Sequence, residues 1–334
     1  MYGILRQLKP KDKLNILCMD THERYQSNLA RTGHNFFSIK PPNSKGWNEE
    51  YAPLPPNYHI IDANYFYKTF IHQIDFDLIL SQTKFGQYQT FHQLANLLHV
   101  PLISLEHTVP NDVAAEEKIA LYQQMGGHIN VYLWNYSKQA WRSNRINDRI
   151  VYHGMDTDFW RLDTPVEQRE PRILTVVNDF INRDRECGYG VWRYVTDLMP
   201  TSVYGTTPGL SKAAESSAEL VNIYNRHQIY VNTSIVSSLP MSLLEAAACG
   251  CAIVTTKTCA IPEIFTHNEN CLISNDADEM RSYVIELLND KDKIIRLSNA
   301  ARKMIEDTLP MDRFVNKWNR IFNEAANTTF KELL

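Results

Sequence analysis

The chain has 334 residues and a mass of 38.7 kDa, with 44% hydrophobic and 22% charged residues. This composition is that of a globular protein and excludes a disordered, collagenous or coiled-coil chain, while the length suits two domains of about 150 residues each. The 34 Lys and Arg residues against 38 Asp and Glu residues give a net charge of −4, whereas a protein dedicated to nucleic acid is usually strongly basic.

In the first half of the chain, short apolar runs alternate with longer amphipathic segments, which is typical of βαβ units and parallel sheets. The predicted strands are 14–20, 77–82, 101–106 and 129–134. The predicted helices are 23–31, 87–98 and 112–125. Five prolines between Pro41 and Pro56 predict a long loop.

The second half repeats this alternation. Its predicted strands are 172–178, 201–205, 228–232 and 251–256. Its predicted helices are 187–199, 213–226, 240–249, 276–289, 291–307 and 312–326. We therefore expect an α/β protein with two Rossmann-like domains, residues 1–150 and 151–309, and a final helix within 310–334 that Pro310 separates from the rest.

The cellular setting is inferred from the cysteines and from the apolar runs. Six cysteines are too few for a disulfide scaffold in a chain of this length, and we expect reduced thiols in the cytoplasm. No signal-peptide pattern and no run of about 18 apolar residues occurs. Residues 1–13 alternate basic and apolar side chains, which permits weak peripheral membrane contact, but Gly3 and Pro10 interrupt the pattern and favour a frayed tail.

The most specific segment runs from Ser237 to Ile264, with the sequence SSLPMSLLEAAACGCAIVTTKTCAIPEI. Pro240 begins a helix, Gly250 ends it, and a strand follows at once. Glu245 lies mid-helix among apolar residues, where an unpaired carboxylate is costly, so it either faces a polar ligand or a partner in the crevice at the strand ends, or caps or salt-bridges a neighbouring loop. The turn 260–263 starts a short helix whose free N–H groups are expected to hold an anion.

This segment resembles the nucleotide-sugar signature of family-4 retaining glycosyltransferases with the GT-B fold, two Rossmann-like domains facing each other across a cleft. That signature reads Glu-Gly-Phe-x-x-x-x-x-Glu-Ala-x-Ala-x-Gly and ends in a Gly-Ile-Pro-Glu turn. Three further segments match in the expected order, and they are 23–36 (ERYQSNLARTGHNF), 153–160 (HGMDTDFW) and 269–280 (ENCLISNDADEM). The resemblance spans most of residues 14–310 and implies a final helix that crosses back to the first domain.

The resemblance implies a role for several residues. Glu245 corresponds to the carboxylate that accepts hydrogen bonds from the ribose hydroxyls of the donor. His107 corresponds to the histidine that contacts the donor sugar, although a lone histidine is more often a structural one. Further donor-binding candidates lie at the turn after the first strand, at the strand end near 205 and at the start of the signature helix, and they are Thr21, His22, Glu23, Gly205, Ser237, Ser238, Leu239 and Pro240.

The chain departs from the family pattern at three places. Ser237 stands where the family has its first signature Glu, which reads the donor sugar, and Ser238 stands where it has Gly. The glycine-rich turn that follows the first strand is absent. The family's Arg and Lys pair is out of register, so Arg183 and then Arg185 are the candidates for binding the donor diphosphate, unless neighbouring acids pair with them.

The predicted reaction is transfer of a sugar from a nucleoside-diphosphate donor to an acceptor hydroxyl with retention, and no cofactor or metal is expected. The histidines show no metal-ligand spacing, and the P-loop and G-x-S-x-G motifs are absent. A carbohydrate or lipid-linked acceptor is expected. Three alternatives stay open, namely a glycosyltransferase for hydroxymethylated DNA bases, which the modest +2 charge of residues 1–150 does not favour, a nucleotide-sugar isomerase, and a non-catalytic binding subunit.

Overall fold

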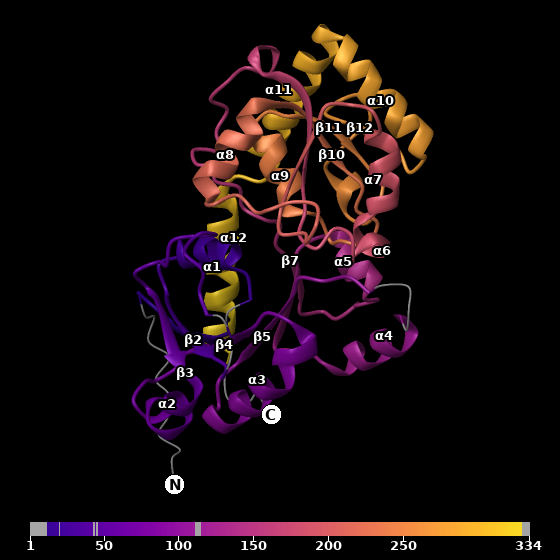
Figure 1. Ribbon diagram of the computed structural model, residues 1–334. Coiled ribbons are helices and arrows are strands. Elements are labelled where there is room, and N and C mark those ends of the chain that lie inside the picture. Colours follow the sequence, from indigo (N-terminus) through magenta and orange to yellow (C-terminus); the bar gives the residue numbers. More distant parts are fainter. Residues whose placement is uncertain (1–11, 20, 43, 45, 111–114, 329–334) are drawn as a thin grey trace.

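The computed structural model describes residues 12–328 except 20, 43, 45 and 111–114. The predicted membrane contact of residues 1–13 therefore lies almost wholly outside the described residues. Parallel strands form two separate sheets, each flanked by helices, and one unit lies above the other (Figure 1). The α/β class and the pair of Rossmann-like units are as the sequence predicts.

The first sheet and its helices make up the N-terminal unit. The strand order is β3-β2-β1-β4-β5-β6-β7, with every pair parallel. The strands are β1 (Asn15–Cys18), β2 (Asn35–Lys40), β3 (Tyr58–Asp62), β4 (Leu78–Ser81), β5 (Leu102–Glu106), β6 (Ile129–Tyr132) and β7 (Asp148–Ile150). The helices are α1 (Glu23–Ala30), α2 (Ala63–Lys68), α3 (Lys84–Leu98), α4 (Ala115–Gln124) and α5 (Asn135–Ala140).

The second sheet and its helices make up the C-terminal unit. The strand order is β12-β11-β10-β8-β9, again all parallel. The strands are β8 (Glu170–Val176), β9 (Thr201–Tyr204), β10 (His227–Asn232), β11 (Ala252–Thr255) and β12 (Leu272–Ile273). The helices are α6 (Asp184–Cys187), α7 (Tyr189–Thr196), α8 (Ser217–Arg226), α9 (Met241–Ala248), α10 (Ala277–Asn289) and α11 (Lys291–Thr308). The last helix, α12 (Met311–Ala326), follows this unit in the chain and packs against the N-terminal unit. Three short 3-10 helices lie at Phe70–His72, Val166–Gln168 and Ile261–Glu263.

Several elements were not predicted, namely β2, β3, β7, β12, α2, α5 and α6. Strand β7 is an edge strand of three half-buried residues, so it has no apolar run to mark it. The predicted helix 187–199 corresponds to α7, and the short helix α6 before it was not predicted. Gly188 separates the two, because it has φ +70° and a Cβ there would lie 2.3 Å from the Thr233 carbonyl oxygen. The long loop from Pro41 to Pro56 contains no helix or strand among its described residues.

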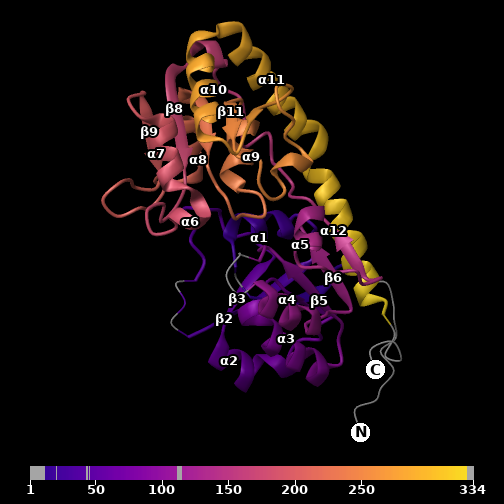
Figure 2. The ribbon, with the colours of Figure 1, turned by 90° about the vertical axis from the view of Figure 1, so that its right-hand side faces the viewer.

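The chain crosses between the units twice, and the two crossings lie side by side. Met155, on the way to the C-terminal unit, donates its N–H to the Leu309 carbonyl on the way back (2.8 Å). Beyond Pro310, helix α12 descends along the N-terminal unit beside α1 (Figures 1 and 2). There Trp318 donates its indole N–H to the Tyr25 hydroxyl (3.2 Å), so the final helix crosses back as expected.

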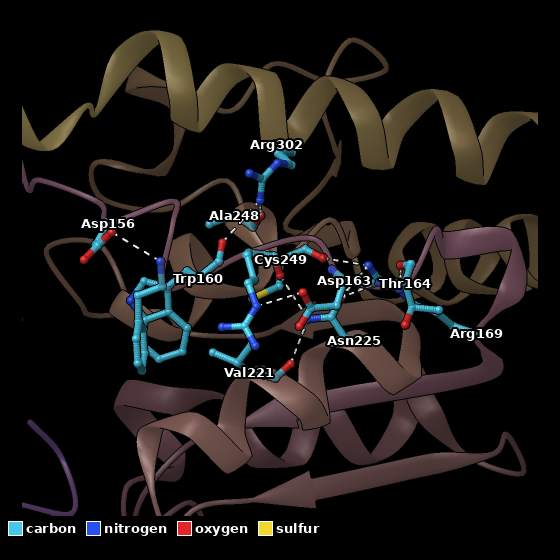
Figure 3. Close-up of polar contacts among 12 residues, drawn as sticks. Asp156, Trp160, Asp163, Thr164, Arg169, Val221, Asn225, Ala248, Cys249 and Arg302 are labelled. Atoms are coloured by element: carbon cyan, nitrogen blue, oxygen red, sulfur yellow. Dashed lines mark hydrogen bonds and ion pairs between the residues drawn. The ribbon is translucent and has the colours of Figure 1, made fainter.

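The segment after the first crossing is tied to the C-terminal unit by side chains (Figure 3). The Asn225 side-chain oxygen accepts from the N–H groups of Asp163 (2.8 Å) and Thr164 (3.2 Å). Arg169, 5% exposed, donates to the Thr164 carbonyl (2.7 Å) and to the Cys249 carbonyl at the end of α9 (2.7 Å). These contacts make residues 163–169 a part of the C-terminal unit.

None of the described helices is long and apolar enough to cross a bilayer. None of the six cysteines, all of them described, forms a disulfide, and five of them are buried.

Candidate functional site

A cavity of about 410 Å³ lies between the two units. Its wall includes His22 after β1, Val177 after β8 and Ser234 after β10. The strand order reverses between β1 and β4 in one sheet and between β8 and β10 in the other. Open α/β sheets bind ligands at the carboxyl ends of their strands at such reversals, so the cavity lies where the fold places a ligand.

Glu245 on α9 forms part of the cavity wall and is completely buried. One carboxylate oxygen accepts a hydrogen bond and ion pair from Arg24 on α1, and the other accepts from the Tyr224 hydroxyl (3.1 Å). The partner that the sequence left open is thus a cation from the opposite unit, and it engages the carboxylate within the cavity wall. The expected crevice and a salt bridge occur together, and the salt bridge is to helix α1 of the opposite unit.

Arg24 is a cavity residue that sequence reasoning missed. Its guanidinium lies over the Trp160 ring, 5.2 Å from the centroid, and 3.5 Å from the Ser217 hydroxyl. Burial alone would lower the pKa of Arg24, but the Glu245 carboxylate raises it above its ordinary value, so the Arg24 guanidinium stays charged. Arg24 lies in the segment ERYQSNLARTGHNF, which carries one of the four resemblances to the family, and this could have identified it. The sequence prediction instead selected Thr21, His22 and Glu23 just before it.

The cavity brings together seven of the predicted site residues, namely His22, Glu23, Arg183, Gly205, Ser237, Pro240 and Glu245. They come from loops more than two hundred residues apart in the chain. Gly205 has φ +111°, and a Cβ there would lie 2.0 Å from the Val177 carbonyl oxygen, so only glycine fits. Their roles in binding stay predictions.

Five predicted residues lie outside the cavity wall. The Thr21 hydroxyl accepts from the Gln87 amide (3.0 Å), and the Ser238 hydroxyl bonds that of Ser137 (2.7 Å). Leu239, 4% exposed, packs in the core, and Arg185 is exposed. The fifth residue is His107, which directly follows strand β5.

His107 follows β5 and packs edge-on against Tyr25, with ring centroids 4.6 Å apart. His153, shortly after β7, also packs edge-on against Tyr25, with ring centroids 5.6 Å apart. Burial, together with the neighbouring histidines, lowers the pKa of His107 to about 3, and burial with His22 nearby lowers the pKa of His153 to about 3. Both imidazoles are therefore neutral in ordinary buffers, and each ring offers one hydrogen-bond donor and one acceptor.

Arg183, at the start of α6, is exposed in the cavity. Two of the neighbouring acids bind other groups, since Asp179 accepts from the Asn182 side chain (2.7 Å) and Asp184 from the Gly190 N–H (2.8 Å). Neither Arg183 nor Arg185 makes an ion pair with another described residue. The Arg183 guanidinium is thus available to an anion.

The turn at Ala260–Glu263 does not hold an anion through free N–H groups, contrary to expectation. The Ala260 N–H donates to the Ser238 carbonyl (3.1 Å), and the turn's other amides are used within it. The Glu263 carboxylate instead accepts from the N–H groups of Asn135 (3.2 Å) and Tyr136 (2.6 Å). It therefore caps the start of α5 and joins the two units.

Among the described residues, no group of three or more His, Cys, Asp or Glu side chains is arranged to hold a metal ion.

Comparison with known proteins agrees with this geometry. Residues 213–304 match the family model described as Glycosyl transferases group 1, a segment that contains Ser237 and Glu245. Three solved structures superimpose over nearly the whole chain at low identity. They are a glycosyltransferase from Rickettsia africae ESF-5 (14% identity, TM-score 0.68, 96% of this chain and 100% of that one), Anabaena HepE in complex with UDP (10%, 0.72, 93% and 100%) and sucrose-phosphate synthase from Thermosynechococcus elongatus (12%, 0.73, 93% and 99%).

The chain has the GT-B fold. No curated protein sequence matches it. In GT-B vocabulary, the two units are the two facing domains and the cavity lies in the cleft between them.

Proposed function

We propose that the protein is a retaining glycosyltransferase that moves a sugar from a nucleoside-diphosphate donor to an acceptor hydroxyl. The observation that carries this proposal is Glu245, a charged carboxylate on the wall of the interdomain cavity and inside the matched segment 213–304. The Anabaena structures of the same fold hold UDP and UDP-glucose, which supports a nucleotide sugar as the donor.

In this proposal the C-terminal unit holds the nucleotide. Glu245 accepts hydrogen bonds from two ribose hydroxyls, which one carboxylate can do because it has two oxygens. Arg183 binds the diphosphate and stabilises the charge that develops on it as the sugar leaves. Gly205 lies on the wall of the same cavity, where a side chain would clash with the Val177 carbonyl.

The N-terminal unit approaches from the opposite side. Neutral His107, which lies outside the wall of the cavity, reaches the sugar when the cleft closes, and a phosphate oxygen of the leaving group takes the acceptor proton on the same face, so the reaction needs neither a protein base nor a metal. Closure of the cleft excludes water and limits hydrolysis of the donor. Glu50 and Tyr51, in the loop between Pro41 and Pro56, line the cavity, which makes this loop the candidate for choosing a carbohydrate or lipid-linked acceptor.

The setting we propose is the cytoplasm, with peripheral membrane contact if the acceptor is lipid-linked. Six cysteines without a disulfide support a reducing compartment.

The test is a calorimetric screen of UDP-, GDP- and ADP-sugars against the wild type, Glu245→Gln and, as a control, Glu167→Gln at an exposed glutamate. Loss of hydrogen bonds to a charged carboxylate is expected to weaken donor binding by about tenfold or more, while the control binds as the wild type does. A wild type that binds none of these donors would sink the proposal.

Product analysis by NMR tests the rest of the proposal. We expect release of the nucleoside diphosphate only with an acceptor present, and a product with the donor's anomeric configuration. Conversion of the donor in the absence of an acceptor would instead identify an isomerase.

A further inference from the structure

Glu245 is closed off by a residue of the opposite unit. Its side chain is completely buried, and both of its oxygens are engaged, one by Arg24 and the other by the Tyr224 hydroxyl. Two ribose hydroxyls reach this carboxylate only if Arg24 moves. We propose that Arg24 is a donor-binding residue that exchanges Glu245 for a phosphate oxygen when the donor enters; this rests on the proposed function.

The Arg24 guanidinium has hydrogen-bond donors that are not fully used in this structure. A guanidinium carries five N–H donors, yet the Arg24 Nε atom is buried without a partner among the described residues. The contact of Nη2 with the Ser217 hydroxyl is long, at 3.5 Å. When the ribose takes Glu245, this cation loses its counter-charge in a partly buried place, which is costly unless another anion replaces it.

The donor itself supplies that anion. The described residues of the cavity wall carry the carboxylates Glu23, Glu50 and Glu245 and the guanidinium groups Arg24 and Arg183. While Arg24 is paired with Glu245, a diphosphate in the cavity has only Arg183 as a free guanidinium. Release of Arg24 adds a second one, and a guanidinium matches phosphate oxygens bidentately.

The position of Arg24 gives the exchange a mechanical consequence. Arg24 lies in the first turn of α1 in the N-terminal unit, whereas Arg183 belongs to the C-terminal unit. A diphosphate that contacts both links the two units through the ligand. The ion pair of the donor-free cleft is thereby replaced by a bridge that contains the donor, which couples donor binding to closure.

The experiment compares nucleoside diphosphates with their nucleosides. UDP, GDP and ADP, and uridine, guanosine and adenosine, are titrated calorimetrically into the wild type, Arg24→Gln and Arg31→Gln. The control Arg31 lies on the same helix and pairs with Asp156 at the surface. For the base that the wild type binds, Arg24→Gln should weaken the diphosphate by about ten- to a hundredfold and leave the nucleoside no weaker, while Arg31→Gln changes neither.

The nucleoside arm separates the exchange from simple competition. If Arg24→Gln strengthens or weakens both ligands equally, or changes neither, Arg24 has no bond to phosphate and the inference is overturned. If the wild type binds none of the diphosphates, the proposed function fails instead.

A second comparison keeps the test decisive if Arg24→Gln does not fold with Glu245 left buried and unpaired. Glu245→Gln is compared with the double variant Arg24→Gln/Glu245→Gln, in which no carboxylate is stranded. The diphosphate should again bind about tenfold or more weaker in the double variant, with the nucleoside unchanged. Equal diphosphate affinity in the two variants overturns the inference.

Discussion

His107 and His153 show how a buried ring can keep one protonation state. Both pack against Tyr25, and burial lowers the pKa of each to about 3. In the unfolded chain a histidine titrates near 6.5. Between about pH 3 and 6.5 the unfolded state therefore binds more protons than the folded state. The free energy of unfolding consequently decreases as the pH falls through this window.

This linkage predicts a pH effect for His153→Asn, whose site is 6% exposed in the wild type. The free energy of unfolding should fall less steeply between pH 6 and 4 in the variant than in the wild type, by up to about 1.4 kcal/mol per pH unit. Urea denaturation at several pH values measures the slope, with His72→Asn at an exposed position as the control. An unchanged slope would contradict the assignment of His153 as a neutral buried ring.

At the scale of elements, one buried arginine holds the C-terminal ends of two helices. Arg169 donates to the Cys249 carbonyl after α9 (2.7 Å) and to the Tyr224 carbonyl in α8 (3.2 Å). A cation suits helix C-termini, where carbonyl groups lack partners. Because Tyr224 in turn hydrogen-bonds Glu245, this arginine supports the cavity wall from behind.

Arg169→Ala should lower the free energy of unfolding of the C-terminal unit by about 3 kcal/mol, because it leaves several buried carbonyl groups without a donor. Urea denaturation followed by circular dichroism measures the change. The control is Arg172→Ala, which removes an exposed guanidinium that pairs with Glu170 on strand β8. This variant should lose less than about 0.5 kcal/mol of the free energy of unfolding. Equal losses in the two variants would show that the carbonyl contacts of Arg169 are not decisive.

At the scale of the whole molecule, α12 holds the two units together. Its buried side chains, Phe314, Trp318, Ile321, Phe322 and Ala325, recur at helical spacing. Trp318 is completely buried and hydrogen-bonds Tyr25, and Phe322 packs against Phe36 with ring centroids 6.0 Å apart. A helix that begins beside the C-terminal unit is thus completed by the core of the N-terminal one.

Trp318→Ala should therefore cost about 3–5 kcal/mol of stability and loosen the placement of the units. Thermal unfolding measures the first effect, and the radius of gyration from small-angle scattering, expected to increase, measures the second. Asn323→Ala, on the exposed side of α12, should change neither. A compact variant with wild-type dimensions would mean that α12 is not what fixes the placement of the units.

The sequence by itself determined the elements whose patterns are local. Buried parallel strands such as β5 are continuous apolar runs, and α12 is a strongly amphipathic repeat, so both could be predicted from a window of a few residues. The segment from Ser237 to Ile264 also pointed to Glu245 and to the GT-B fold. Edge strand β7 escaped because its three residues carry no such pattern.

Only the tertiary structure decided what Glu245 faces. Its partner Arg24 is 221 residues away in the chain, and the two meet because parallel sheets bring their strand ends to one cleft. The sequence likewise predicted that Glu263 belongs to an anion-binding turn. In the structure its carboxylate instead caps the start of α5 in the other unit. Local sequence determines which residues form strands and helices, whereas burial and charge pairing between units depend on contacts that no local pattern contains.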